Sequence, residues 1–262
     1  MTPFISVSFS GGKDSTAMLL QMIEKGEQIN EVVFCDTGLE FPQMYDHVKK
    51  IREIVESHNI NFVTLTAPYS FEYYLLEYPI DSKKYGLHYG FGWPTPVIRW
   101  CTKHLKTQLI EQHYRELSDI EVIRCIGLAS DEQKRIERTE GKIGYRYPLN
   151  EWGQTEKDAL QYCYSKGFDW GGLYEIFGRV SCWCCPLQPI GSLKKLYKLY
   201  PDLWAQLQKW DENITMRGFK VKYRDTCTVY DLTKRFSRET LAEKTQTHLT
   251  DYLEKLKKGG DQ

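Results

Sequence analysis

The 262-residue sequence has no excess of charge of either sign and no long hydrophobic segment. Lys and Arg together number 35, as do Asp and Glu, which excludes a strongly basic nucleic-acid binder and an acidic tail protein as whole-chain classes. No apolar run approaches the roughly 20 residues that a membrane-spanning helix needs. The N-terminal sequence MTPFISVSFSGGKDS lacks the features of a signal peptide. We therefore expect a cytoplasmic protein without membrane contacts.

Low-complexity sequence is absent as well. The chain has 19 Gly and 10 Pro, and its 41% hydrophobic and 27% charged residues are typical of a folded protein of one to two domains. It also has eight cysteines, for which a reducing compartment disfavours disulfide bonds. The spacing of the cysteines therefore has to indicate their role.

Hydrophobic periodicity predicts an alternation of strands and helices in the first part of the chain. Short links between these elements favour parallel pairing with right-handed crossovers. We therefore predict an α/β fold, with an open parallel five-stranded sheet that has helices on both faces and a mostly helical C-terminal part. The predicted strands are 4–9, 31–36, 61–65, 120–128 and 145–149, and the predicted helices include 42–58, 98–117, 155–166, 190–200, 201–216 and 238–257. Residues 67–97, with four prolines, are expected to be irregular.

A glycine loop follows the first predicted strand and precedes a predicted helix. It reads Ser10, Gly11, Gly12, Lys13, Asp14 and Ser15. Adjacent glycines permit a tight turn whose N–H groups can bind an anion, and the helix N-terminus adds partial positive charge at the same place. The spacing differs from the longer Walker A loop. A glycine-rich turn with a polar helix cap is the structural alternative.

This loop resembles the pyrophosphatase loop of the adenine-nucleotide α-hydrolase-like superfamily. Further segments resemble the phosphoadenosine phosphosulfate reductase family within that group. They are VFCDTGLEFP at 33–42, IGLASDE at 126–132, and YPLNEW at 147–152 followed by Thr155, Glu156 and Asp158. The resemblance implies a Rossmann-like nucleotide-binding domain over 1–150, followed by a Cys-cluster segment and helical region over 151–262.

The resemblance also implies site residues. The glycine loop, the turn Asp36–Thr37–Gly38 and Gly127 would bind ATP or adenylyl sulfate, since loops after parallel strands converge on one sheet edge. Lys13 would neutralise phosphate, and Asp14 or Asp36 would orient Mg²⁺ or the loop. Arg135 and Arg138 would clamp the acceptor or the α-phosphate, unless they belong to a solvated helical face.

A second strong motif is Cys182-Trp183-Cys184-Cys185-Pro186. Cys182 and Cys185 have the C-x-x-C spacing of metal ligands, and proline often follows iron–sulfur ligands. The family's cluster-containing reductases have a Cys-Cys pair about eighty residues earlier, where this chain has Trp100-Cys101. The resemblance thus implies a [4Fe–4S] cluster on Cys101, Cys182, Cys184 and Cys185, while structural zinc and metal-free packing stay open.

Two departures from the family bear on the reaction. The reductases use a C-terminal Glu-Cys-Gly-x-His segment, whereas this sequence has no Cys after Cys227. The glycine-loop motif of the reductases is usually degenerate, whereas the motif of this sequence is intact. Both departures favour an ATP user, and a DNA phosphorothioation enzyme among the relatives combines such a loop with a cluster. We therefore expect cleavage of ATP to AMP and pyrophosphate, adenylylation of an acceptor, and iron–sulfur-assisted sulfur transfer.

Two other functions stay open at this point. One is an adenylyl-sulfate or phosphoadenylyl-sulfate reductase with a nucleophile such as Cys227, and the other is a non-catalytic nucleotide-binding partner with structural metal. A sulfur donor protein or a thiol reductant is the expected partner. Residues 190–262 carry 15 Lys and Arg against 10 Asp and Glu, with interleaved aromatics. Basic residues interleaved with aromatic ones suggest that this region contacts a nucleic-acid acceptor or, more simply, that it forms an amphipathic helical core.

Overall fold

The computed structural model describes residues 2–83, 86–117, 120–138, 143–180, 182–224 and 226–259, without the side chains of residue 244 and residues 246–259. Packing divides the chain into two compact units. Unit 1 comprises 1–74 and 99–185, and unit 2 comprises 75–98 and 186–262. The sequence-based division after residue 150 stays a prediction about domain organisation, whereas these units are defined by packing alone.

Unit 1 contains a five-stranded sheet in which all neighbouring strands are parallel, in the order β3-β2-β1-β6-β7. This confirms the predicted sheet. The strands are β1 (Phe4–Phe9), β2 (Glu31–Asp36), β3 (Asn61–Thr66), β6 (Val122–Ile126) and β7 (Tyr145–Arg146). The order reverses at β1, which pairs with β2 on one side and with β6 on the other. Open parallel sheets bind ligands at such a reversal.

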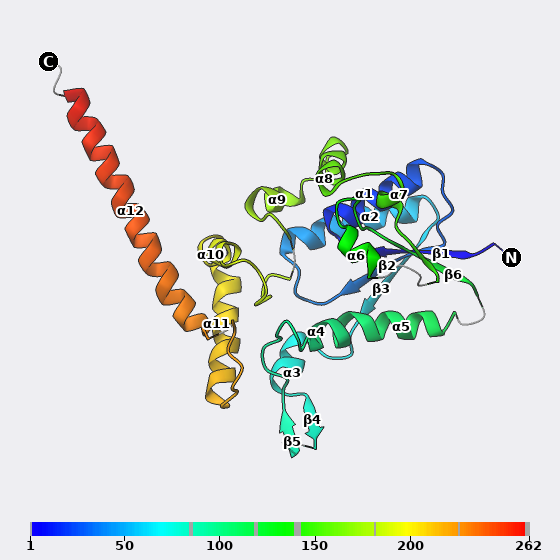
Figure 1. The fold of residues 1–262 in the computed structure, drawn as a ribbon, viewed down its shortest axis with the longest axis horizontal. Helices are drawn as coiled ribbons and strands as arrows, with labels where there is room; N and C mark the ends of the chain where they lie inside the picture. The colour runs from blue at the N-terminus through cyan, green and yellow to red at the C-terminus, as the bar shows by residue number, and fades with distance from the viewer. Residues whose placement is uncertain are drawn as a thin grey trace. The chain divides into compact units, whose positions relative to one another are not determined.

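Helices cover both faces of this sheet, as predicted. Figure 1 shows α1 (Lys13–Glu24), α2 (Pro42–Ser57) and α8 (Glu156–Ser165) on one face and α5 (Gln108–Arg115) on the other. The remaining helical segments of unit 1 are short. They are α4 (Trp100–Thr102), a π-helix (Lys103–Thr107), α6 (Gln133–Glu137), α7 (Pro148–Glu151), a 3₁₀ turn (Trp170–Gly172) and α9 (Leu173–Ile176).

The core of unit 1 lies between the sheet and α1, α2 and α8. The side chains of Val7, Met18 and Leu19 are completely buried, as are those of Cys125 and Cys163. Each of these two thiols has its pKa raised by burial, to about 11 for Cys125 and about 12 for Cys163. Cys125 and Cys163 are therefore neutral core residues at physiological pH.

Two sequence predictions about local structure are wrong. Residues 67–97 are not irregular throughout, because they contain α3 (Phe71–Leu76) and an antiparallel hairpin of β4 (Pro79–Ser82) and β5 (Gly86–Tyr89). The predicted strand 145–149 ends at Arg146, because Pro148 occupies the first position of α7. Proline has no amide hydrogen for a strand ladder, but its fixed φ suits a helix start.

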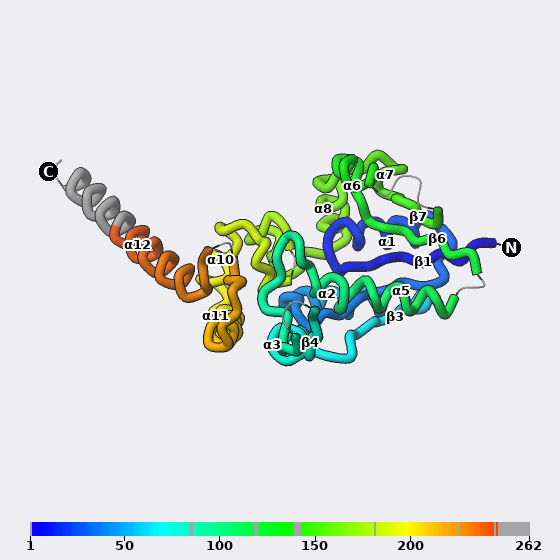
Figure 2. Tube along the Cα trace, turned by 60° about the horizontal axis from the view of Figure 1, so that its bottom comes forward, coloured from blue at the N-terminus to red at the C-terminus, as the bar shows by residue number. Residues whose placement is uncertain are grey.

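Unit 2 is built on three helices, which Figure 2 shows from a second direction. They are α10 (Ile190–Leu199), α11 (Pro201–Met216) and α12 (Val229–Gly259), and the last begins nine residues before the predicted helix 238–257. Leu193, Leu207, Ile214, Val229 and Phe236 are buried and form the core of the bundle. Among the described residues, no helix is both long and apolar enough to cross a membrane.

Candidate functional site

The loops after β1, β2 and β6 lie at the carboxyl edge of the sheet, because their strands are parallel. Gly127, directly after β6, touches the start of α1. A Cβ added at Gly127 would lie 2.8 Å from the Ser15 backbone nitrogen and 2.9 Å from the Asp14 carbonyl carbon. Only glycine permits this approach, so the glycine loop and the end of β6 form one packed structure.

The glycine loop is held by bonds within itself. The Ser10 amide donates to Ser15 Oγ (3.1 Å), and Ser15 Oγ donates to the Gly12 carbonyl (3.0 Å). Gly11 has φ +77°, and a Cβ added there would lie 2.7 Å from Met44 Sδ. Gly11 therefore has to be glycine for its conformation and for the packing of α2 beneath it.

Lys13 does not extend into solvent. Its ammonium lies 2.8 Å from Asp14 Oδ1 and 2.6 Å from Glu156 Oε2, and its side chain is 9% exposed. Burial disfavours the charged ammonium, but the bonds to Asp14 and Glu156 outweigh this effect and raise the pKa of Lys13. The structure thus brings Lys13 and Asp14 together in an ion pair, and Glu156 joins them without having been assigned a role from sequence.

An aromatic segment after α8, which the sequence analysis did not single out, contacts the glycine loop. Trp170 Nε1 donates to the Gly11 carbonyl (2.8 Å), and the Lys13 amide donates to the Tyr174 hydroxyl (2.8 Å). The rings of Trp170 and Tyr174 meet edge to face at 4.8 Å. No motif marked these residues, because their role depends on the chain returning to the loop about 160 residues later.

The turn after β2 has its own hydrogen bonds. Asp36 Oδ1 accepts from the Gly38 amide and from the Tyr45 hydroxyl, both at 2.9 Å. Thr37 is buried, and its hydroxyl donates to Glu40 Oε1 (3.3 Å). Asp36 therefore shapes the turn in this structure. A role of Asp36 toward Mg²⁺ stays a prediction.

The short helix α6, in the segment after β6, contains no buried residue. Arg135 forms an ion pair with Glu132 three residues earlier, and Arg138 lies at the end of the short α6. Asp131 accepts a hydrogen bond from the Glu156 amide at the start of α8 (3.1 Å). The Arg135–Glu132 pair is the helical-face arrangement considered from sequence, and a clamp by Arg135 and Arg138 on phosphate stays a prediction.

The four predicted metal-ligating cysteines come from two segments of unit 1. Cys101 lies in α4, and Cys182, Cys184 and Cys185 follow the aromatic segment. Burial and, to a smaller extent, the neighbouring Glu40 raise the pKa of Cys182 to about 12. Cys182, Cys185 and Cys101 also raise the pKa of Cys184 beyond the effect of burial, so the four thiols interact electrostatically.

Two charged residues accompany these thiols. Glu40 is buried, and Cys182 Sγ donates to its carboxylate at 3.8 Å. Lys106 lies 4.0 Å from the same carboxylate and comes from the π-helix, a rare conformation that often occurs at functional sites. Burial disfavours the Lys106 ammonium, but the attraction of Cys182, Glu40, Cys35 and Cys101 raises its pKa.

The donor chemistry of this region fits an iron–sulfur cluster or zinc, since both bind cysteine thiolates. Eight of eight cysteines lie in the described residues, and none of them forms a disulfide. In the described ranges, however, no three His, Cys, Asp or Glu side chains are arranged to hold a metal ion. The four thiols thus interact electrostatically, but within the described ranges they do not form a complete metal-coordination site.

The family model of the phosphoadenosine phosphosulfate reductase domain matches residues 4–188. The chain belongs to this family. The match spans the sheet, the glycine loop and all four cysteines of the cluster segments, which confirms the resemblance inferred from sequence.

Two curated relatives are uncharacterized proteins of Methanocaldococcus jannaschii. MJ0973 is 30% identical over 82% of this chain and 51% of its own length, and MJ0066 is 27% identical over 84% and 42%. The chain thus spans about half the length of the curated relatives it matches. A solved structure, the U34-tRNA thiolase NcsA from Methanococcus maripaludis with its [4Fe-4S] cluster, matches over 90% of this chain and 72% of its own, with 14% identity and TM-score 0.42.

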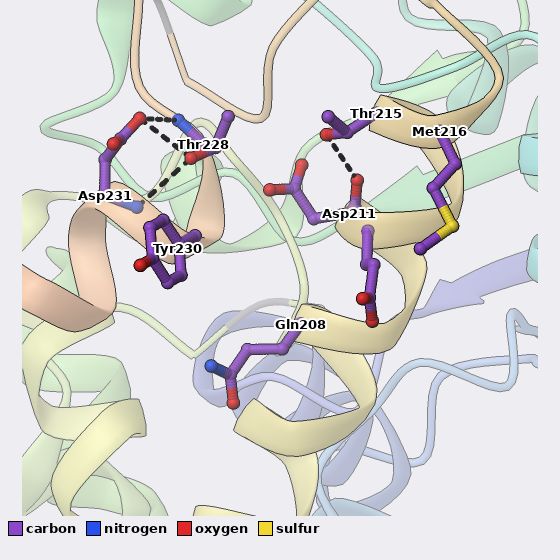
Figure 3. Close-up of a pocket in the computed structure, with 8 residues that line it drawn as sticks. Gln208, Asp211, Thr215, Met216, Thr228, Tyr230 and Asp231 are labelled. Carbon is purple, nitrogen blue, oxygen red and sulfur yellow. Dashed lines mark hydrogen bonds between the residues drawn. The ribbon is translucent and has the colours of Figure 1, made fainter.

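Unit 2 contains a pocket of about 510 Å³ between residues of α11 and the start of α12 (Figure 3). Two of its carboxylates form hydrogen bonds within unit 2. Asp211 accepts from the Val229 amide (2.6 Å) and from Trp93 Nε1 (2.7 Å), and Asp231 accepts from Thr228 at the start of α12. No residue predicted from sequence for catalysis lines this pocket.

The aromatic and basic residues of unit 2 also have structural partners. Trp204, Trp210 and Tyr223 are buried. Lys194 pairs with Glu239 and Glu243. These contacts are those of a helical core with paired surface charges, and a nucleic-acid acceptor stays a prediction.

Proposed function

We propose that this chain is an ATP-using enzyme of the phosphoadenosine phosphosulfate reductase family that releases pyrophosphate and adenylylates an acceptor for sulfur transfer. The observation that carries the proposal is the glycine loop between β1 and α1, at the strand-order reversal of the sheet. The loop has the tight turn at Gly11 and the close contact with Gly127 that an anion cradle requires.

In the proposed reaction an acceptor oxygen or nitrogen attacks the α-phosphorus of ATP. The bond from the α-phosphorus to the bridging oxygen breaks, and pyrophosphate leaves with the electron pair. The N-terminal end of α1 would stabilise the charge that develops on the leaving group. Lys13, already fixed between Asp14 and Glu156, would add a positive charge beside it.

The cysteines would serve the sulfur-transfer half of this function. Cys101, Cys182, Cys184 and Cys185 would hold a [4Fe–4S] cluster, with zinc as the alternative, and Lys106 would lie beside its negative charge. A bound cluster would supply iron that can bind and activate sulfur. Because Cys182 and Cys184 have raised pKa values, deprotonation of these two thiols would accompany metal binding.

The first test separates the proposed enzyme from its alternatives. Anaerobically purified protein is analysed for iron, zinc and sulfide, and is then given ATP and Mg²⁺ or adenylyl sulfate and a thiol. Pyrophosphate release from ATP supports the proposal. Sulfite release from adenylyl sulfate alone would indicate a reductase, and nucleotide binding without either product would indicate a non-catalytic partner.

A variant tests the loop itself. We expect Lys13→Ala to lower pyrophosphate release at least tenfold, since a lost charged contact to a leaving group typically costs a few kcal/mol. Lys157→Ala, which removes an exposed lysine from the first turn of α8, is the matched control. Unchanged ATP affinity and turnover in Lys13→Ala would contradict the assignment of the loop.

A further inference from the structure

The first amide of α1 has an unusual hydrogen-bond partner for an anion-binding loop. The Lys13 N–H donates to the Tyr174 hydroxyl oxygen, 2.8 Å away, rather than pointing at open solvent. A helix N-terminus presents several such amides to a ligand. In this chain the first of them reaches a ligand only through Tyr174.

The Tyr174 hydroxyl stands directly over the glycine pair. A Cβ added at Gly12 would lie 3.3 Å from the Tyr174 hydroxyl and 3.5 Å from Ser10 Oγ. Two hydroxyl groups therefore flank the space above Gly12 that the missing side chain leaves open. Ser10 is exposed, so this space is open to solvent.

The hydrogen-bond chemistry of tyrosine decides what Tyr174 can do there. Accepting the Lys13 amide uses a lone pair of the oxygen, so the hydroxyl hydrogen can still donate to another group. A bond received from the amide polarises the O–H and strengthens the bond that it donates. Burial raises the pKa of Tyr174, so the hydroxyl keeps its proton at physiological pH.

The position of Tyr174 is fixed by packing. Its ring meets Trp170 edge to face, and Trp170 Nε1 donates to the Gly11 carbonyl. The Trp170 ring in turn lies tilted by 38° against the His47 ring, with 4.6 Å between the ring centroids, and His47 Nε2 lies 2.9 Å from Thr16 Oγ1 of α1. The ring contact with Trp170 and the hydrogen bond from the Lys13 amide thus fix the hydroxyl against the loop, as a preorganised ligand contact requires.

We propose that Tyr174 is a phosphate-binding residue at the glycine loop. Its hydroxyl accepts the hydrogen bond of the Lys13 amide and donates a hydrogen bond to a β- or γ-phosphate oxygen. The inference rests on the proposed function, since it takes ATP or pyrophosphate as the ligand. It assigns to the segment after α8 a direct part in binding the leaving group.

The test measures the affinities of wild type and Tyr174→Phe for inorganic pyrophosphate, ATP and AMP by calorimetry. Phenylalanine keeps the ring contact with Trp170 and removes only the hydroxyl. We expect pyrophosphate and ATP to bind about tenfold more weakly, the usual effect of one hydrogen bond to a charged group. AMP, which lacks the β- and γ-phosphates, should bind unchanged.

Tyr164→Phe is the matched control, because it removes a hydroxyl from an exposed tyrosine of α8. Equal pyrophosphate binding in Tyr174→Phe would overturn the inference, and tighter binding would overturn it and show that the hydroxyl competes with the ligand. Equal weakening of AMP would overturn it in favour of a structural role. If wild type bound none of the three ligands, the proposed function itself would fail.

Discussion

The glycine loop and the cysteine segments lie in the same unit of the protein, yet they differ in how complete they are. The loop is built from backbone geometry. Gly11, Gly127 and the hydrogen bonds with Trp170 and Tyr174 fix its shape. The cysteine segments bring four thiols near one another, but in the described residues no three ligating side chains are arranged around a metal position.

The difference has a physical cause. A backbone anion site carries only partial charges, and its amides can be oriented by the fold in advance. Buried thiols favour the protonated state, as the raised pKa values of Cys182 and Cys184 show, and protonated thiols do not ligate metals. We therefore expect the loop to bind an anion without proton release, whereas metal binding at the cysteine segments would release protons from Cys182 and Cys184.

The largest expected effect concerns the cysteine site. We expect Cys182→Ala to remove essentially all iron and sulfide, because the proposed ligand beside Glu40 is lost. The measurement is iron and sulfide per chain after anaerobic purification. Cys125→Ala, which changes a buried residue of β6, should keep the metal content of wild type. Equal iron in both variants would show that the cysteine segments are not the metal site.

A second prediction breaks the glycine loop. Gly127→Ala places a Cβ 2.8 Å from the Ser15 backbone nitrogen, so the start of α1 has to move. We expect the free energy of unfolding to fall by about 3 kcal/mol, as in other overpacked sites, and pyrophosphate affinity to fall at least tenfold. Urea unfolding and calorimetry measure the two effects.

Gly178→Ala is the matched control for this change, because nothing lies within 4 Å of a Cβ added there. It should leave both quantities near their wild-type values. A stable Gly127→Ala protein with normal pyrophosphate binding would contradict the view that the close contact between β6 and α1 forms the loop.

A third prediction concerns His47, whose ring contacts Trp170 beside the glycine loop, and the pH dependence of the free energy of unfolding. Burial, aided by Lys50, lowers the pKa of His47 from 6.5 to about 3, so on acidification the unfolded chain takes up this proton first. The stability from neutral His47 is complete above pH 6.5 and is lost as the pH falls toward 3. The loss is about 1.4 kcal/mol per pH unit, or roughly 2 kcal/mol at pH 5.

The measurement compares urea unfolding at pH 7.5 and pH 5.0. Wild type should lose roughly 2 kcal/mol more than His47→Gln, which keeps a hydrogen-bonding group near Thr16 but does not titrate. His58→Gln, on the exposed end of α2, should behave as wild type. If the free energy of unfolding depended on pH identically in His47→Gln and wild type, the lowered pKa of His47 would be refuted.

The smallest predicted effect concerns α8, which carries Glu156 to Lys13. Thr155 and Asp158 form a reciprocal capping box at its start. Thr155→Ala should lower the free energy of unfolding by about 1 kcal/mol, the usual cost of a lost N-cap, with little change in metal content. Thr155→Ser, which keeps the hydroxyl, is the control and should retain most of the stability in thermal unfolding.

Much of unit 1 could be predicted from sequence. The strands 4–9 and 31–36 were predicted with the bounds that the structure has, because alternating or continuous apolar runs between turn residues specify buried parallel strands. The glycine loop was also predictable, since a turn between a strand and a helix is determined by neighbouring residues. The fold class and the family followed from these local patterns.

Other features depended on contacts between distant segments. The hairpin of β4 and β5 lies in a proline-rich stretch where no periodicity indicated a pair of strands. Tyr174 and Lys106 reach their partners only after the chain has folded, from positions with no motif of their own, and the sequence motif that contains Glu156 did not indicate its contact with Lys13. A local pattern contains no information about such partners.

The sequence by itself determined the parallel sheet, the position of the glycine loop and the two cysteine segments, because each follows from the order and spacing of neighbouring residues. Only the tertiary structure decided which groups surround them. It placed Lys13 between two carboxylates, Tyr174 on the first amide of α1, and Glu40 and Lys106 beside Cys182. Burial and electrostatic interaction arise from packing in three dimensions, which residue spacing does not encode.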